Sequence, residues 1–142
     1  MSLIKKRDLP GVTPVPVLQL RGIVGTTITL MALQDHIIKA FQMPEAKAVV
    51  LIINSAGGDL AEAVLIANFL KTVSSKYEVP YYAFVQVFLI IDKYIFNIFV
   101  QGPADSAAYY IASSAYQIFV TVASTVGSIG IKIEVPYLTF PK

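Results

Sequence analysis

The chain contains no cysteine and a single histidine, and only 14% of its 142 residues are charged. The lack of cysteine excludes disulfide bonds, thiolate metal sites and a cysteine nucleophile. Histidine, cysteine and carboxylate clusters are the usual ligands of zinc and other transition metals, and one histidine gives little basis for such a site. We therefore expect neither a metal ion nor another cofactor.

A large excess of charge and a membrane-spanning segment are also lacking. The net charge is +2, and the basic tail Lys5–Arg7 is too short and too poor in aromatic residues to predict nucleic-acid binding. The first residues lack the apolar region of a secretory signal. The longest apolar stretch, Val79–Gln101, is interrupted by Asp92 and Lys93, whereas a spanning helix needs about 20 nearly uncharged residues. The sequence thus predicts no export signal and no transmembrane helix.

Apolar residues, by contrast, are abundant. They make up 56% of the sequence, against roughly 45–50% in an ordinary soluble domain. Large exposed apolar patches on a monomer favour aggregation, so the excess must be covered. We expect residues 1–142 to form a single, incomplete domain whose excess apolar surface is covered by partner subunits and by further chain.

The spacing of the apolar residues predicts alternating strands and helices. Residues 16–22 alternate between apolar and polar, which is typical of a strand. Helical spacing between Leu30 and Phe41 predicts a helix capped by Thr26 or Thr27. The uninterrupted apolar run at 48–53 predicts a strand covered on both faces, as in a parallel sheet flanked by helices.

The second half continues this pattern. Asp59 is a good N-cap, Glu62 stands where a capping box needs it, and the polar cluster Ser74–Lys76 is expected to end the helix near Val73. Further elements are expected as strands at 79–86, 117–122 and 129–135 and as a helix at 106–115. This order predicts an α/β fold with right-handed crossovers and a mostly parallel sheet.

In such a fold the functional site lies beyond the carboxyl ends of the strands. Gly57 and Gly58 follow the strand at 48–53, and their amides either donate to a developing oxyanion or simply allow a tight turn with positive φ. Ser106 stands where a strand gives way to a helix, so it is either a nucleophile or an N-cap residue. Ala107 and Ala108 are small enough to let a substrate backbone approach. The residues alone leave both alternatives open.

Three segments together resemble the signal peptide peptidase A (SppA and SohB) family of serine peptidases, within the wider ClpP/crotonase fold. Leu51–Gly58 resembles the family's Asn-Ser-Pro-Gly-Gly turn, Ala104–Ala112 resembles its Ala-Ser-Gly-Gly-Tyr-Tyr nucleophile segment, and Ser124–Gly130 completes the set. The resemblance covers nearly the whole chain. It implies a ClpP/crotonase-like fold, a mostly parallel sheet with flanking helices, and a serine endopeptidase that acts by acyl transfer.

The resemblance also implies roles for individual residues. Ser106 takes the nucleophile position, and the amide of Gly57 or Gly58 forms an oxyanion hole with the amide of Ala107. The family uses a Ser–Lys dyad, in which a desolvated lysine accepts the serine proton. The family's lysine lies several tens of residues after the serine, and this chain offers Lys132 and the terminal Lys142, neither at the family's position. Lys132 is the base candidate.

The partners and the location follow from the same resemblance. It implies a peptide or protein substrate, such as a signal peptide or a membrane-derived fragment, and a homo-oligomer of ring shape. It further implies a cytoplasmic protein that associates peripherally with the inner face of the membrane. The only histidine, His36, precedes the serine in the sequence and is expected to be a surface residue of the first helix.

Several features depart from the family pattern. Ala56 replaces the proline of the glycine turn, and Asp105 places a carboxylate directly before the nucleophile, where it opposes the developing negative charge. The triplet Phe84–Gln86 recurs as Phe99–Gln101, so residues 87–101 form an insertion or partial duplication beside the site. This insertion is expected to lengthen a strand, to form a β-hairpin about Asp92 and Lys93, or to block the cleft.

These departures keep three functions open. The first is an SppA-type peptidase, inactive if the chain lacks its base. The second is a catalytically dead relic or a module of the same fold for peptide binding or oligomerisation. The third is a crotonase-like acyl-CoA enzyme, for which the expected glutamates near the site are missing.

Overall fold

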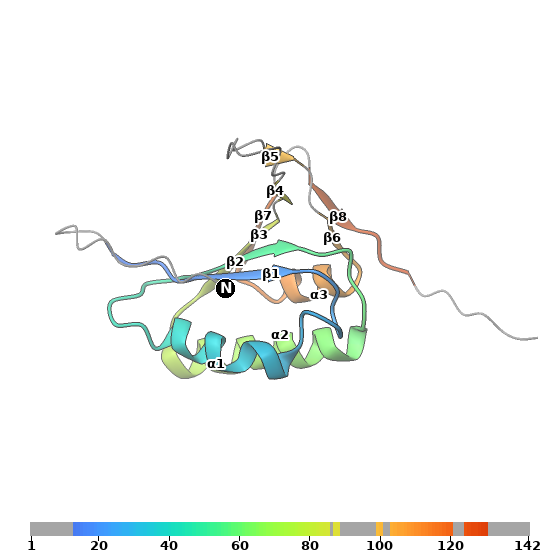
Figure 1. Cartoon of the computed structure of the whole chain (residues 1–142). Helices are drawn as coiled ribbons and strands as arrows, with labels where there is room; N and C mark the ends of the chain where they lie inside the picture. Colours follow the sequence, from blue (N-terminus) through green and yellow to red (C-terminus); the bar gives the residue numbers. More distant parts are fainter. Residues whose placement is uncertain (1–12, 86, 89–98, 101–102, 121–123, 131–142) are drawn as a thin grey trace, which may run out of the picture.

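The structure is a computed structural model that describes residues 13–85, 87–88, 99–100, 103–120 and 124–130. Strands and helices alternate along the chain (Figure 1). In order they are β1 (Val17–Arg21), α1 (Leu30–Phe41), β2 (Val49–Asn54), α2 (Leu60–Tyr77), β3 (Tyr81–Val85), β4 (Val87–Phe88), β5 (Phe99–Val100), β6 (Pro103–Asp105), α3 (Ala107–Ser113), β7 (Gln117–Val120) and β8 (Thr125–Gly127).

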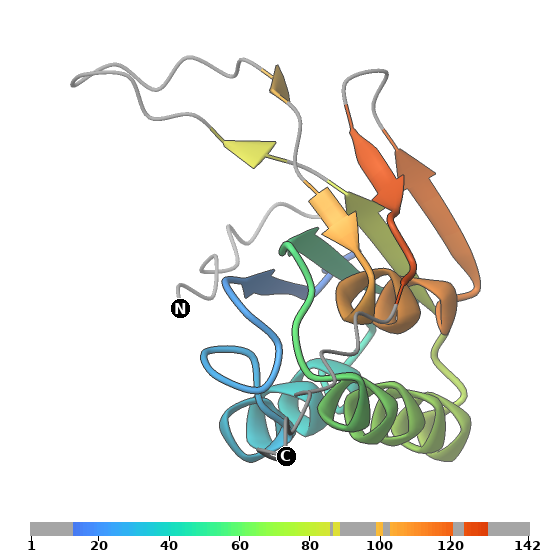
Figure 2. The ribbon, with the colours of Figure 1, turned by 90° about the vertical axis from the view of Figure 1, so that its right-hand side faces the viewer.

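The main sheet has the strand order β1-β2-β3-β7, and every neighbouring pair in it is parallel. This confirms the predicted α/β class. The helices α1, α2 and α3 lie on one face of the sheet (Figures 1 and 2). The expectation that β2 is covered on both faces was therefore wrong: along β2, fully buried residues alternate with half-buried ones, because the helices cover one face.

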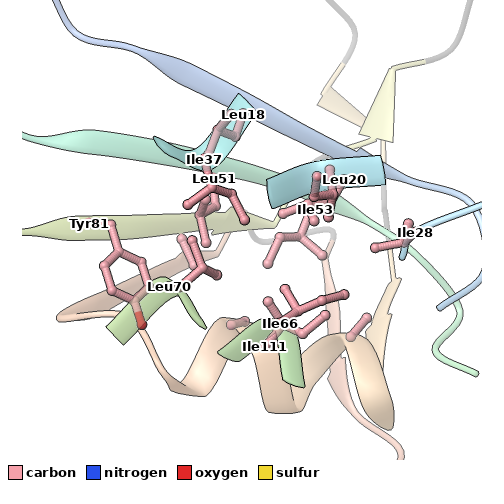
Figure 3. Close-up of a cluster of buried hydrophobic side chains, with 14 of the residues drawn as sticks. Leu18, Leu20, Ile28, Ile37, Leu51, Ile53, Ile66, Leu70, Tyr81 and Ile111 are labelled. Carbon is pink, nitrogen blue, oxygen red and sulfur yellow. The ribbon is translucent and has the colours of Figure 1, made fainter. Parts of the chain in front are cut away.

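The core lies between this face and the helices (Figure 3). Leu51 and Ile53 point from β2 toward Ile66 and Leu70 of α2 and Ile111 of α3, and all five are at most 2% exposed. Burying such a side chain contributes about 1.5–3 kcal/mol each. This packing anchors α3, and with it the residue that precedes it, against the end of β2.

The first turn of α1 differs from the prediction. The N-cap is Thr29, whose side chain accepts from the Ala32 N–H, and not Thr26 or Thr27. Thr27 is engaged elsewhere, because its hydroxyl accepts from the Ile23 N–H at 2.8 Å in the preceding turn.

Helix α2 begins as predicted but ends later. Asp59 caps it, accepting from the Ala61 and Glu62 amides at 2.7 and 3.2 Å. Glu62 does not complete a capping box, because its carboxylate accepts from the Leu30 N–H at the start of α1. The cluster Ser74–Lys76 does not end the helix near Val73, since α2 continues to Tyr77 and stops at Glu78 in the left-handed conformation, φ 55°.

The segment 87–101, expected to be an insertion, pairs with itself at its ends. β4 and β5 are antiparallel, with Val87 opposite Val100 and Phe88 opposite Phe99, and they form a sheet separate from the main one. Three arrangements were expected for this segment, and the antiparallel pairing of its ends is that of a β-hairpin. Asp92 and Lys93, the expected turn, lie outside the described residues.

The last strand also differs from the prediction. The structure has a strand that was not expected, β8 at Thr125–Gly127; of the strand expected at 129–135, Ile129 and Gly130 are not in a strand and residues 131–135 lie outside the described part. β8 pairs in parallel with β6, as the Ala104–Val126 pair shows.

The face of the main sheet opposite the helices carries a surface that we call the aromatic patch, formed by Tyr82, Phe84, Tyr116 and Phe119. Phe84 stacks on Phe119 with ring centroids 4.7 Å apart, and Tyr82 packs edge-on against Tyr116. The patch is open to solvent, because Phe84 is 38%, Phe119 39% and Tyr116 78% exposed. Part of the excess of apolar residues in the sequence therefore lies on the surface, in the aromatic patch.

Candidate active site

The glycine turn after β2 lies directly against the start of α3. A methyl group on Gly57 would lie 2.7 Å from the Asp105 carbonyl oxygen and 3.1 Å from the Cβ of Ser106. Gly57 also has a φ of +93°, which favours glycine. The two segments that the sequence places 49 residues apart are in contact, and this contact requires that residue 57 have no side chain.

Ser106 has an uncommon backbone conformation, with φ 48° and ψ −114°. Residues other than glycine rarely adopt such angles, and holding one there costs about 1–3 kcal/mol. The residue forms a sharp turn between strand β6 and helix α3, the geometry that exposes the nucleophile in strained strand-to-helix turns. Ser106 holds the N-cap position, but its side chain makes no capping hydrogen bond. Ser106 thus has the N-cap position that one alternative expected, without the side-chain hydrogen bond of a capping serine.

The backbone of Ser106 is anchored from both directions. Its N–H donates to the Gly127 carbonyl of β8 at 2.7 Å, and its carbonyl accepts from the Tyr110 N–H at 3.0 Å. In the sequence, the resemblance alone points to a role for the segment Ser124–Gly130 at the site. The structure shows that it supports the serine through the Gly127 carbonyl, a backbone contact that no side-chain pattern reveals.

The amides of Gly57, which lies against Ser106, and of the following Gly58 differ in their hydrogen bonds. The Gly57 N–H donates to the Ser55 hydroxyl at 3.1 Å. The N–H groups of Gly58 and Ala107 donate to no residue in the described part of the chain. Ala107 is the first residue of α3, where helical N–H groups have no partner within the helix. The glycine pair that the sequence could not separate thus divides into an occupied amide and a free one.

Asp105 places a carboxylate immediately before the serine. Its Oδ1 atom is buried and has no hydrogen-bond partner among the described residues. A buried carboxylate oxygen without a partner is costly unless a cation or a donor reaches it. Lys132 and Lys142, the base candidates, lie outside the described residues. His36 is on α1, half-buried rather than fully at the surface.

The described residues contain no group of three or more histidine, cysteine, aspartate or glutamate residues that could hold a metal ion. They also contain no helix that is both long and apolar enough to cross a membrane.

The fold is ClpP/crotonase-like. Two solved structures carry this conclusion, both of the 1510-N membrane-bound stomatin-specific protease. The first, a serine-to-alanine mutant, has a TM-score of 0.58 and 18% sequence identity over 86% of this chain and 55% of its own. The second, a lysine-to-alanine mutant in complex with a substrate peptide, has a TM-score of 0.56 and 17% identity over 81% of this chain and 44% of its own.

Sequence comparison gives a different kind of neighbour. The chain is 29% identical over 136 residues to proteins named Na(+)/H(+) antiporter NhaA from Brucella melitensis and Brucella abortus. The alignment covers 91% of this chain but 16% of those proteins, so the chain spans about a sixth of their length. No family model matches the chain. These matches do not define a family for it.

Proposed function

We propose that the chain is a serine peptidase of the signal peptide peptidase A type, with Ser106 as its nucleophile. The observation that carries the proposal is the strained backbone of Ser106, with Gly57 packed against it and with the neighbouring Ala107 N–H unbonded among the described residues. Strain of this kind persists only where the surrounding structure enforces it, and it is concentrated at active sites. A capping or purely structural serine would need neither the strain nor the neighbouring free donor.

The chemistry follows from these positions. The Ser106 Oγ attacks the carbonyl carbon of a peptide bond, and its proton passes to a base, for which Lys132 is the candidate. The carbonyl oxygen becomes an oxyanion and accepts hydrogen bonds from the Gly58 and Ala107 amides, while the Gly57 amide supports the turn. Such donors act at about 3 Å from the oxygen. The protonated amine leaves, and water releases the acyl group from Ser106 by the same steps.

Asp105, together with a base candidate that does not stand at the family's position, predicts slow turnover. The carboxylate opposes the charge that develops on the oxyanion, and loss of general-base help lowers the rate by about 10²–10⁴-fold. The unpartnered Asp105 oxygen is the specific observation that favours the second candidate, a catalytically dead module of the same fold that binds peptide or sister subunits.

The substrate and the partners remain proposals from the resemblance. We propose a peptide or protein substrate at the inner face of the membrane, in keeping with the membrane-bound and stomatin-specific protease that shares the fold. We also propose a homo-oligomer, which the exposed aromatic patch supports because subunit contact would cover it.

Labelling with a fluorophosphonate probe tests the proposal, since the probe reacts with activated serines. We expect the wild-type chain to be labelled, Ser106→Ala to be unlabelled, and Ser113→Ala to be labelled at the wild-type rate. Ser113 is a matched control because it is an exposed serine of α3 that hydrogen-bonds the Tyr110 carbonyl. A folded wild-type chain that resists the probe, or equal labelling of Ser106→Ala, would contradict the proposal and favour the non-catalytic module.

A further inference from the structure

Ser55 is a polar residue buried in the core at the end of β2, with 2% of its surface exposed. Its hydroxyl accepts from the Gly57 N–H at 3.1 Å and lies 3.5 Å from the Gly57 carbonyl oxygen. Its own carbonyl accepts from the Asp105 N–H at 3.3 Å. Ser55 thus contacts both halves of the site, the glycine turn and the segment that carries the nucleophile.

The direction of the Gly58 N–H depends on the Gly57 carbonyl, because both belong to one peptide unit. That unit is planar and trans, so the N–H points opposite to the carbonyl. The Gly57 carbonyl accepts from the Val24 N–H at 2.9 Å. With the Gly57 carbonyl and N–H both held, the Gly58 N–H has one direction, away from Val24.

Glycine gives this turn little rigidity of its own. Gly57 and Gly58 have φ values of +93° and +137°, and glycine reaches many other conformations at equal ease. External hydrogen bonds must therefore fix the turn. The Ser55 hydroxyl is the side-chain group that does so, and alanine in its place would fill the buried space while leaving the Gly57 N–H without a partner.

We propose that Ser55 is a positioning residue of the oxyanion hole: its hydroxyl holds the Gly57 peptide so that the Gly58 amide faces the Ser106 side chain. This inference rests on the proposed peptidase function of Ser106. It assigns Ser55 no contact with the substrate, so its loss changes the reaction step and leaves the binding of a substrate unchanged.

The test compares the rate of fluorophosphonate labelling as a function of probe concentration in the wild type, Ser55→Ala, Ser55→Thr and Ser74→Ala. We expect the maximal rate in Ser55→Ala to fall at least about tenfold, which is less than the 10²–10³-fold loss for removal of an entire oxyanion donor, because the Gly58 amide is displaced and not removed. The half-saturating concentration should stay within about twofold. Ser55→Thr keeps the hydroxyl and should recover much of the rate. Ser74→Ala is the control, because it removes a hydroxyl that donates to the Val79 carbonyl far from the site.

A second measurement keeps the inference separate from the proposed function. The amide signals of Gly57, Gly58 and Ala107 are followed by NMR in the folded wild type and in Ser55→Ala, where we expect the Gly57 and Gly58 signals to shift or broaden. If the wild type does not react with the probe, the peptidase proposal fails, and these signals alone decide the inference. Unchanged Gly58 signals in Ser55→Ala, or equal rate losses in Ser55→Ala and Ser74→Ala, would overturn it.

Discussion

Replacing Gly57 by alanine should separate the glycine turn from the nucleophile. The new methyl group would lie 2.7 Å from the Asp105 carbonyl oxygen and 3.3 Å from the Ala107 nitrogen, both backbone atoms that cannot rotate away. The φ of +93° adds strain that an alanine does not tolerate well. The left-handed conformation costs about 1–2 kcal/mol and overpacking about 1–3 kcal/mol, which together give roughly 2–5 kcal/mol.

Two other glycines make matched controls, because they separate strain from contact. Gly127 has a φ of +112° but no described atom within 4 Å of an added methyl group, so Gly127→Ala adds strain without overpacking and is a control for stability only, because the Gly127 carbonyl accepts from the Ser106 N–H. Gly130 has neither a positive φ nor a described atom within 4 Å of an added methyl group, so Gly130→Ala should change the free energy of unfolding by less than about 0.5 kcal/mol. Gly127→Ala should lower the free energy of unfolding by about 1–2 kcal/mol. Gly57→Ala should lower it the most of the three variants.

Urea denaturation of the three variants and the wild type measures these free energies, and the labelling rate of Ser106 is recorded on the folded proteins. Gly57→Ala should lose stability and labelling together, since the methyl group pushes on the residues that hold the nucleophile. Equal losses of stability in Gly57→Ala and Gly127→Ala would show that the turn does not press against Ser106, and would refute this account of the site.

Two further predictions concern the rest of the molecule. Burial raises the pKa of Tyr81 above its usual 10.0, and the hydrogen bond to Ser114 lowers it by a smaller amount. The unfolded chain therefore loses this proton first, so the free energy of unfolding falls as the pH rises above about 10. In urea denaturation from pH 9 to 11, Tyr81→Phe should show a shallower fall than the wild type, and equal slopes would contradict this prediction. Phe119→Thr should weaken self-association in sedimentation velocity, because Phe119 is 39% exposed within the aromatic patch; a wild type that stays monomeric at tens of micromolar would contradict the proposed oligomer.

The fold could be predicted where a local sequence pattern is compatible with only one kind of secondary structure. The apolar run of β2, the cap at Asp59 and the helical spacing in α1 each determined their element, and the parallel order followed from their alternation. Element ends were less predictable where a side chain acts at a distance. Glu62 had the spacing of a capping box, yet its carboxylate caps another helix, and this contact depends on how α1 and α2 pack.

The site was predictable in its side chains and not in its backbone. The sequence placed both the glycine turn and Ser106 after strands, and the structure brings them into contact, while their catalytic roles come from the resemblance. The Gly127 carbonyl that holds Ser106, and the Ser55 hydroxyl that occupies the Gly57 amide, depend on tertiary contacts across long separations in sequence. No local pattern encodes which amide remains free.

The most direct test of the central claim is a crystal structure of the chain after reaction with a fluorophosphonate. The proposed function predicts phosphorus bonded to the Ser106 Oγ, with a phosphonyl oxygen about 3 Å from the amide nitrogens of both Gly58 and Ala107. An adduct on another residue, or a phosphonyl oxygen that faces away from these two amides, would contradict the claim that Ser106 and the glycine turn form the active site of a serine peptidase.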